Sequence, residues 1–348
     1  MTENNLLSIC CLGYNHAPFI EANIRAIWDS GCKDIEIIAV DDGSKDNSGE
    51  ILKKLQKQSP IPMKVLLQEN TGNIAHNFNV AWHEAKGKYI TFMALDDVLQ
   101  SDKIAEAINY LEQDEKCVFV ASSVITGIDN DGNICNDIPS LKLNFLKNPI
   151  IDDLLELEYS EFGAFYLQGS FFRKDIVDAV GGFDEDMLGD DIVLRTKVFR
   201  YIKQHPELSF KILTCPLCSY RQHDGNIHSN HMRQIKIVTQ YLGRYWPDKP
   251  IPQILLTWAM SSCQQWLENK EIDNLKQFLE LFPGLYEKTI ECIFEKLQSV
   301  YDAEISRQHK MNRWRKLCGR IVKQHKTTYY FLYIPIWKKL KIKETINA

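Results

Sequence analysis

The sequence predicts an α/β protein built on a mostly parallel sheet, and three observations carry this prediction. Apolar, strand-like runs alternate with helical segments from residue 6 to residue 97. Helices of this length between strands are typical of the crossover connections of a parallel sheet. Two pairs of adjacent aspartates, Asp41–Asp42 and Asp96–Asp97, end two of the apolar runs. Because ligands bind beyond the carboxyl ends of parallel strands, both pairs are expected at one ligand-binding edge.

Each element of this first part has a local reason. The strands are short apolar runs that end in Gly, Asp or Asn, and they are expected at residues 6–15, 34–44, 62–70 and 88–97. The helices carry an apolar stripe at helical spacing, with Pro18 near the first start and Gly31 and Gly87 at two of the ends. These helices are expected at residues 17–31, 45–58, 72–87 and 102–110.

The later segments are less regular. A strand is expected at residues 117–129, followed by a turn at 130–133. Residues 161–202 mix an aromatic strand, a short helix, a double-glycine turn and an acid-led helix, and residues 209–226 read as a last strand and loop. From residue 232 to residue 306 the pattern is helical. We therefore divide the chain into a main α/β domain (1–230), a helical extension (231–305) and a tail (306–348).

The composition, with 45% hydrophobic and 25% charged residues, is that of a globular protein. The first residues lack the pattern of a signal peptide, and no apolar run approaches the roughly 20 residues of a spanning helix. We therefore expect a cytoplasmic protein whose ten cysteines are reduced. Cys215 and Cys218 have the spacing of zinc ligands, but no second pair follows them, so a strand that runs into a polar loop is the favoured interpretation.

The charge is unevenly distributed. The net charge is −5, yet residues 306–348 hold 12 Lys and Arg and one acid, which leaves −16 for the remainder. An acidic body argues against a general nucleic-acid binder. The tail has an aromatic patch, Tyr329 to Trp337, between basic residues, a composition typical of membrane interfaces. We expect this tail to bind an anionic membrane surface, peripherally on the inner face of the cytoplasmic membrane; the alternative is a segment that docks on the acidic body.

Six short motifs occur in a fixed order. They are "YNHAPFI", "VDDGSKDNS", "NTGNIAHNFN", "GKYITFMALDD", "GGFDEDM" and "GDDIVLR". In this order and spacing the chain resembles the family 2 glycosyltransferases over roughly residues 7–230. The resemblance implies a GT-A-like (Rossmann-like) fold and an inverting enzyme that uses a nucleotide-diphospho-sugar.

The resemblance also implies a donor site. It suggests that Asp42 accepts the N3–H of a uracil or thymine ring, with Tyr14 stacked near the base, so that a UDP- or dTDP-sugar fits equally. Asp96 matches a contact to the ribose hydroxyls. His76 stands where many members carry an arginine that contacts the donor. Asp41 is expected only to cap the turn that follows it.

Adjacent carboxylates beside a diphosphate require a cation between them. The resemblance makes Asp97 the expected ligand of a divalent metal, Mn²⁺ or Mg²⁺. His223 in "YRQHDGN" matches a position near the diphosphate, so it is expected to contact the metal or the phosphate. The chain departs from the commoner D-x-D-D pattern, because Ala94 occupies the first acidic position. A cap for the helix at residues 102–110 is the alternative for one acid of the pair.

The resemblance assigns the catalytic base to Asp191, and Asp190 stands where the common form has Glu. An inverting transfer is one in-line displacement, in which a carboxylate takes the proton of the attacking hydroxyl. Acids that favour a helix N-terminus are the alternative, above all for Asp190.

The sequence thus predicts a glycosyltransferase of the hexosyltransferase type. The expected acceptor is a saccharide, lipid-linked, in the assembly of bacterial surface polysaccharide or lipopolysaccharide. Two alternatives stay open. One is a metal-dependent nucleotidyltransferase, although "LGYNHAPF" lacks its Gly-rich, Lys- or Arg-bearing phosphate loop. The other is a catalytically silent scaffold that binds sugar nucleotides.

Overall fold

The structure is a computed structural model that describes residues 6–32, 34–139, 142–223, 230–269, 271–282 and 285, and three strands between residues 318 and 340. By their internal contacts the residues form two units, Met1–Trp258 and Ala259–Ala348. The division falls within helix α9 (Gln253–Glu268). The two units are described separately.

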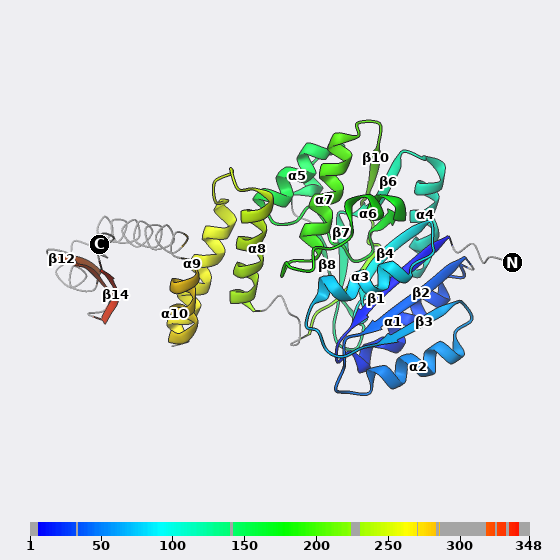
Figure 1. Cartoon of the computed structure of the whole chain (residues 1–348), viewed down its shortest axis with the longest axis horizontal. Coiled ribbons are helices and arrows are strands. Elements are labelled where there is room, and N and C mark those ends of the chain that lie inside the picture. Colours follow the sequence, from blue (N-terminus) through cyan, green and yellow to red (C-terminus); the bar gives the residue numbers. More distant parts are fainter. Residues whose placement is uncertain are drawn as a thin grey trace, which may run out of the picture. The chain divides into compact units, whose positions relative to one another are not determined.

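The first unit contains a seven-stranded sheet in the order β10-β6-β9-β4-β1-β2-β3 (Figure 1). Its strands are β1 (Leu7–Gly13), β2 (Ile35–Asp41), β3 (Met63–Leu67), β4 (Tyr89–Ala94), β6 (Cys117–Ser122), β9 (Phe171–Arg173) and β10 (Ser209–Leu213). The pairs β1–β2, β1–β4, β2–β3 and β6–β10 are parallel, and β9 runs antiparallel between β4 and β6. The predicted fold class is therefore confirmed.

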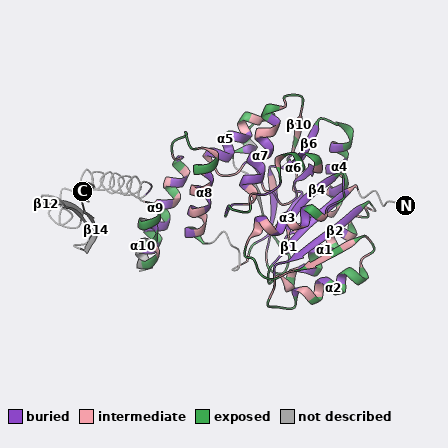
Figure 2. Cartoon of the chain, in the orientation of Figure 1, coloured by how far each residue is buried: buried purple, intermediate pink, exposed green. Residues whose placement is uncertain are grey.

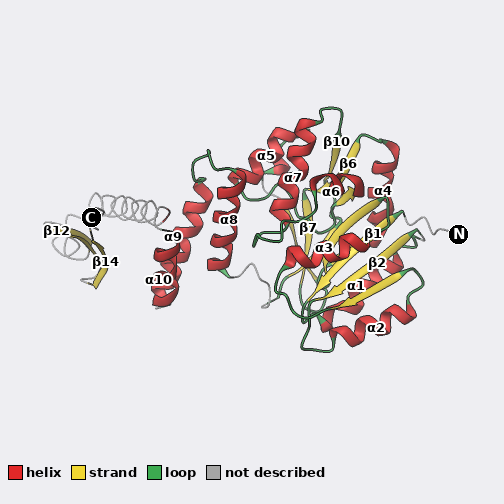
Figure 3. Ribbon diagram, viewed as in Figure 1, coloured by secondary structure: helices red, strands yellow, loops and turns green. Residues whose placement is uncertain are grey.

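Helices cover both faces of this sheet (Figure 3). The helices are α1 (Ala17–Asp29), α2 (Ser48–Gln58), α3 (Ile74–Glu84), α4 (Ile104–Gln113), α5 (Ile151–Ser160), α6 (Lys174–Val180) and α7 (Asp191–Gln204). Alternate residues of β1 face opposite sides, as a strand requires. Ile9 and Cys11 pack in a core with α1, α2 and α4, whereas Cys10 and Leu12 pack in a second core with α3 and α5 to α7.

The register of the central strands brings the two aspartate pairs to one edge. Gly13 on β1 is the partner of Asp41 on β2, and Leu12 is the partner of Ala94 on β4. The strands leading to this edge are buried over nearly their whole length (Figure 2). The predicted placement of both acidic pairs beyond the carboxyl ends of parallel strands is thus confirmed.

A second sheet, in the order β5-β11-β7-β8, corrects two predictions. Its strands are β5 (Val98–Leu99), β7 (Val124–Ile128), β8 (Ile134–Pro139) and β11 (Cys218–Arg221). The single strand predicted at 117–129 is two strands in two sheets. The segment 209–226, predicted as one last strand and a loop, contains two strands, β10 and β11, which also lie in different sheets. Ser122 explains the first break, because its hydroxyl donates to Cys215 O (2.6 Å) and accepts from Val124 N (3.0 Å), and the chain turns there.

Helix α8 (His231–Tyr245) belongs to the first unit, where its Tyr241 hydroxyl lies 2.6 Å from Thr196 Oγ1 on α7. The expected boundaries at residues 230 and 305 stay predictions. In the second unit, Trp266 on α9 contacts Phe278 on α10 (Ile272–Leu281), with ring centroids 6.0 Å apart. Short 3₁₀ turns lie at Ser101–Lys103 and Leu143–Phe145 in the first unit.

Part of the expected tail forms strands. The strands β12 (Cys318–Lys323), β13 (Lys326–Phe331) and β14 (Ile334–Leu340) make an antiparallel sheet in which Tyr329 is the register partner of Trp337. The remaining tail residues lie outside the described part of the chain. Among the described residues, no helix is both long and apolar enough to cross a membrane.

Candidate functional site

The turn after β4 carries the second aspartate pair and is held by a buried asparagine. Asn23 on α1 donates its side-chain amide to Asp97 O (2.7 Å) and Ala94 O (3.2 Å). The Asp97 side chain is buried and accepts the Arg221 backbone N–H at 3.0 Å. Burial raises the pKa of Asp97 well above its usual range, and the neighbouring charge of Asp96 adds to this rise.

The Asp96 carboxylate has different partners from that of Asp97 and contacts two histidines. Its Oδ2 lies 3.0 Å from His223 Nε2 and 3.7 Å from His16 Nε2. Burial lowers the pKa of His16, against the charge of Asp96. Arg221 also belongs to this cluster of Asp96, Asp97, His16 and His223, because its Nε donates to Asp96 O at 2.9 Å. His223 therefore contacts Asp96.

Two atoms of this group have no hydrogen-bond partner within the described residues. Asp96 Oδ1 and His16 Nδ1 are both buried from solvent and unpaired. Unpaired buried polar atoms are costly, and in native proteins they point to a missing water, ion or ligand. Carboxylate oxygen and imidazole nitrogen are suitable donors for Mn²⁺ and related ions. Within the part of the chain that the structure describes, no group of three His, Cys, Asp or Glu side chains is placed to hold a metal ion.

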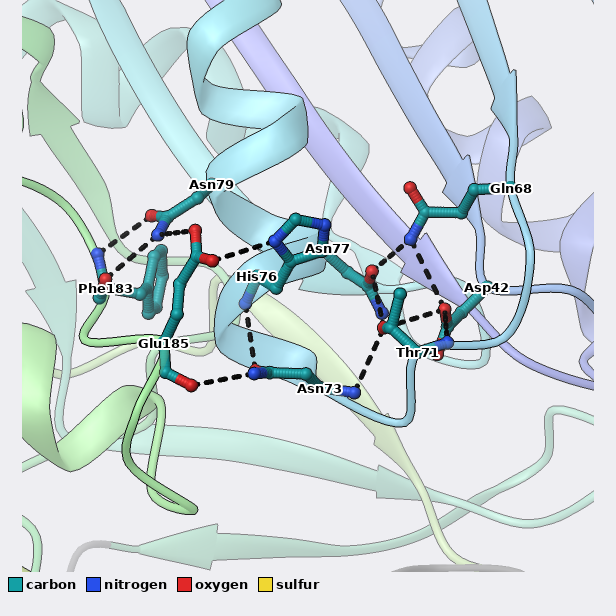
Figure 4. A network of polar contacts seen from close by, with 9 residues as sticks. All are labelled: Asp42, Gln68, Thr71, Asn73, His76, Asn77, Asn79, Phe183 and Glu185. Atoms are coloured by element: carbon teal, nitrogen blue, oxygen red, sulfur yellow. Dashed lines mark hydrogen bonds and ion pairs between the residues drawn. The ribbon is translucent and has the colours of Figure 1, made fainter.

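The first aspartate pair organises the loops after β2 and β3 (Figure 4). Asp42, 5% exposed, accepts from Thr71 N (2.8 Å), Thr71 Oγ1 (3.0 Å), Gly72 N (3.1 Å) and Gln68 Nε2 (3.3 Å). Burial would raise the pKa of Asp42, but the hydrogen bonds from Thr71 and Gln68 outweigh it and the net pKa is lowered. Asp41 accepts from Ser44 N at 3.1 Å and caps the turn, as expected.

Gly43, between this pair and Ser44, is required at its position. Its φ is +67°, and a Cβ there would lie 2.4 Å from Asn70 N. Only glycine adopts that backbone at no steric cost and allows the close approach of the two loops. The neighbouring loop after β1 is tied on by Asn15, whose backbone N–H donates to Ser44 Oγ at 2.8 Å. Tyr14 lies next to Asn15 and is 39% exposed.

His76 on α3 belongs to the same network, which extends to the loop after α6 (Figure 4). Its Nδ1 lies 2.8 Å from Glu185 Oε2, and Asn79 Nδ2 donates to Glu185 Oε1 at 2.8 Å. Asn73, the N-cap of α3, donates to Glu185 O at 2.7 Å. The bonds from Asn79 and His76 lower the pKa of Glu185. The loop after β3 and the "GGFDEDM" loop are thus fixed to each other.

The third acidic pair begins α7. Asp191 is 43% exposed at its side chain; its Oδ1 accepts from its neighbour Ile192 N (2.7 Å), and its Oδ2 accepts from Arg195 Nη1 (2.8 Å). Asp190 lies deeper, and burial together with the charge of Asp191 raises its pKa to about 6. Arg195 also pairs with the fully buried Glu158 of α5 at 2.7 Å.

The loop that leads to this pair is held from α8. Arg244 binds Asp186 through both terminal nitrogens, at 2.8 and 2.6 Å, and Asp184 at 3.3 Å. Lys197 on α7 donates to Asp184 at 2.7 Å. Burial would raise the pKa of Asp184, but its bonds to Lys197 and Tyr245 lower it overall. These contacts fix the chain just before Asp191.

Six of the seven predicted site residues fall into three groups of contacts, and the seventh, Tyr14, lies on the loop after β1. Asp42 and His76 share the first network, Asp96, Asp97 and His223 share the second, and Asp191 belongs to the third. Several members were not predicted, and their common signal is a polar residue among the buried, mostly apolar positions of an amphipathic helix: they are Asn23, Glu158 and Arg195. His16 lies within "YNHAPFI" and Arg221 within "YRQHDGN", but no pattern in these segments distinguishes either residue.

Comparison with known proteins identifies the family. Residues 8–175 match the model of glycosyl transferase family 2. The chain is 34% identical over 130 residues to glycosyltransferase GlyG of Streptococcus pneumoniae, a match that covers 37% of this chain and 42% of that protein. It is 24% identical over 206 residues to the GalNAc(5)-diNAcBac-PP-undecaprenol beta-1,3-glucosyltransferase of Campylobacter jejuni, covering 59% of this chain and 63% of that protein. In both cases the chain spans less than two thirds of the relative's length.

The fold has a solved counterpart. The mannosyltransferase PcManGT of Pyrobaculum calidifontis, solved in complex with GDP-Man and Mn²⁺, has a TM-score of 0.51 and 16% sequence identity. The match covers 83% of this chain and 84% of that one. At this identity the likeness concerns the fold alone. The sequence match carries the family assignment: residues 8–175 of the chain belong to glycosyl transferase family 2.

Proposed function

We propose that this protein transfers a sugar from a UDP- or dTDP-sugar to a saccharide acceptor with inversion at the anomeric carbon. The observation that carries the proposal is the gathering of polar side chains beyond the carboxyl ends of β1, β2 and β4. Gly13, Asp41 and Ala94 are brought to this edge by the strand register. Ligand sites of α/β sheets occur at such edges. The relatives are glycosyltransferases by name.

The nucleoside is proposed to bind at the loops after β1, β2 and β3. Tyr14 is exposed there, next to the fixed Asn15–Ser44 contact, and offers a ring face to a base. Among the described residues, Asp42 Oδ2 accepts one hydrogen bond, from Gly72 N, so it retains a lone pair for the N3–H of uracil or thymine. His76, half exposed beside Glu185, is proposed as a further donor contact.

A divalent metal is proposed to bind the donor diphosphate at the Asp96–Asp97 turn. The unpaired Asp96 Oδ1 and the approach of His223 to Asp96 Oδ2 fit such an ion. These contacts favour Asp96 with His223 as the ligands, and they favour a supporting role for Asp97, whose Oδ1 accepts from Arg221 N. When bound, Mn²⁺ or Mg²⁺ would anchor the diphosphate and offset the charge that develops on it.

The transfer itself is proposed to use Asp191 as the base. The acceptor hydroxyl oxygen forms a bond to the anomeric carbon while the bond from that carbon to the diphosphate oxygen breaks. The hydroxyl proton passes to the Asp191 carboxylate, and the nucleoside diphosphate leaves. Asp191 suits this role because its side chain is 43% exposed at the start of α7, with both oxygens already oriented by hydrogen bonds. Asp190, the alternative base, is less accessible.

The acceptor is proposed to be lipid-linked, in bacterial surface polysaccharide or lipopolysaccharide synthesis. Support comes from the C. jejuni relative, whose name specifies an undecaprenol-linked substrate. The basic residues of 306–348, 12 against one acid, are proposed to hold the enzyme peripherally to an anionic membrane on the cytoplasmic side. Each basic residue near such a surface contributes about 1 kcal/mol of attraction at low salt.

The test is a thermal-shift panel of UDP-, dTDP- and GDP-sugars, each with and without Mn²⁺, followed by turnover with the stabilising donor. A stabilisation of several degrees by one uracil or thymine donor, dependent on Mn²⁺, is the expected result. Equal shifts with GDP-sugars would refute the proposal that the donor carries uracil or thymine. Binding without transfer to any saccharide acceptor would favour the silent scaffold. Consumption of added inorganic diphosphate, with the donor converted to a nucleoside triphosphate and a sugar 1-phosphate, would favour the nucleotidyltransferase.

A further inference from the structure

A buried arginine joins the proposed base to a second, fully buried carboxylate. Arg195 lies one helical turn after Asp191 on α7 and is 2% exposed, and Glu158 on α5 is 0% exposed. The guanidinium donates through Nε to Glu158 Oε1 (2.7 Å), through Nη2 to Glu158 Oε2 (3.2 Å) and through Nη1 to Asp191 Oδ2 (2.8 Å). One cation thus bridges a buried carboxylate and an exposed one.

The loop after α5 closes over this bridge. Ala164 N donates to Glu158 Oε1 at 3.1 Å, and the Phe165 ring lies 5.8 Å from the guanidinium carbon. Phe162, a non-glycine residue, adopts a φ of +59° in this loop. Such a backbone costs energy and persists only where its surroundings enforce it. Burial raises the pKa of Glu158, and the guanidinium opposes that rise; the charges of Glu158 and Asp191 raise the pKa of Arg195 although burial would lower it.

Stability alone does not account for this arrangement. Desolvating two charges is expensive, and an apolar pair of similar volume is often as stable or more so. What an apolar pair could not do is hold the Asp191 carboxylate. Arg195 donates a hydrogen bond to Asp191 Oδ2, and Ile192 N donates one to Oδ1. Because a carboxylate has about four lone-pair sites, about two remain for an incoming hydroxyl.

We infer that Glu158 and Arg195 are positioning residues, which fix the Asp191 carboxylate in the orientation that accepts the proton of the acceptor hydroxyl. Glu158 anchors the guanidinium, and the guanidinium anchors Asp191. This inference rests on the proposed function, in which Asp191 is the base. A misplacement of about 1 Å in such a group costs about 10²-fold in rate.

The test uses the double variant Glu158→Gln/Arg195→Met in the full chain, because removal of Arg195 alone would leave an unpaired buried charge and could prevent folding. The matched control is Asp152→Asn/Lys203→Met, which removes an exposed ion pair of 2.6 Å between the same two helices. Three quantities are measured on each: the melting temperature, the donor affinity by calorimetry, and the kcat and KM of transfer. A fourth, which needs no turnover, is the rate at which a water-soluble carbodiimide and an amine label Asp191, followed by peptide mass spectrometry.

The positioning role predicts that the double variant folds, binds the donor like the wild type, labels several-fold faster at Asp191 and loses about 10²-fold in kcat. The control should match the wild type in all four. Unchanged labelling of Asp191 would refute the inference whether or not transfer is observed. Faster labelling with an unchanged kcat, while Asp191→Asn is inactive, would refute it and leave the proposed function standing. An active Asp191→Asn variant would refute both the proposal that Asp191 is the catalytic base and the positioning role of Glu158 and Arg195.

Discussion

Replacement of Asp42 by asparagine tests which hydrogen bonds stabilise the loops after β2 and β3, where the nucleoside is proposed to bind. The Asp42 carboxylate accepts from two backbone donors, Thr71 N at 2.8 Å on Oδ1 and Gly72 N at 3.1 Å on Oδ2. An amide has one accepting oxygen, and its NH₂ group faces the other backbone N–H whichever way the side chain is turned. One of the two donors must therefore lose its partner in Asp42→Asn, and because the site is buried, water does not readily replace it.

The size of the effect follows from these bonds. A hydrogen bond to a charged group contributes about 1.5–3 kcal/mol, and an unsatisfied buried donor costs a similar amount. The free energy of unfolding is expected to fall by about 2 kcal/mol, or about 4–8 °C in Tm for a domain of this size. The control is Asp102→Asn, whose carboxylate is 77% exposed and whose loss should leave stability unchanged.

Urea unfolding at several pH values is the assay. The pKa of Asp42 is lowered in the folded state, so its contribution is fully present above the ordinary aspartate pKa of about 3.9 and is lost as the pH falls through the lower, folded value. The stability gap between the wild type and Asp42→Asn should therefore be full at neutral pH and shrink below about pH 4. Equal stability of Asp42→Asn and Asp102→Asn at neutral pH would refute the reasoning.

Three other predictions concern the chemistry and the tail. Asp191→Asn should keep the donor affinity measured by calorimetry and lose about 10²-fold or more in transfer, the scale for a lost base; comparable activity would move the base to Asp190. Asp96→Asn should remove the Mn²⁺-dependent part of donor affinity, whereas Asp97→Asn, which can still accept from Arg221 N, should keep most of it; the reverse ranking would restore Asp97 as the ligand. A chain that ends near Ser306 should remain active on a soluble acceptor but no longer pellet with anionic liposomes at low salt; pelleting like the full chain would refute the membrane role.

The fold class and the common edge of the two aspartate pairs could be predicted from sequence because both depend on local patterns. Alternating strands and helices fix a parallel sheet, and the aspartates follow their strands directly in the chain. The breaks within residues 117–129 and 209–226 could not be predicted this way. Their cause is tertiary, because Ser122 bonds to Cys215 O, a partner far away in sequence, and an apolar run looks the same in one sheet or two.

The roles within the second aspartate pair show a second limit. Asp96 and Asp97 are consecutive residues with the same side chain, so the motif alone does not show which one is buried. In the structure the difference comes from Arg221, whose backbone N–H binds Asp97 and whose side chain binds Asp96 O, and from the position of His16. Contacts between residues so far apart in the chain leave no periodic signal.

Helix α8 lies beyond the residues that the family model matches, yet it supports the proposed base. Arg244 holds Asp184 and Asp186, and Gln240 accepts from Leu188 N at 2.9 Å, so three points of the loop before Asp191 are fixed from this helix. Between those points Glu185 binds α3 on the donor side. A base and a donor must be held within about 0.5 Å of their productive geometry for efficient transfer. The loop of residues 184–188 meets this need because Asp184, Asp186 and Leu188 bind α8 while Glu185 binds α3. Helix α8 therefore helps to position the proposed base relative to the proposed donor site.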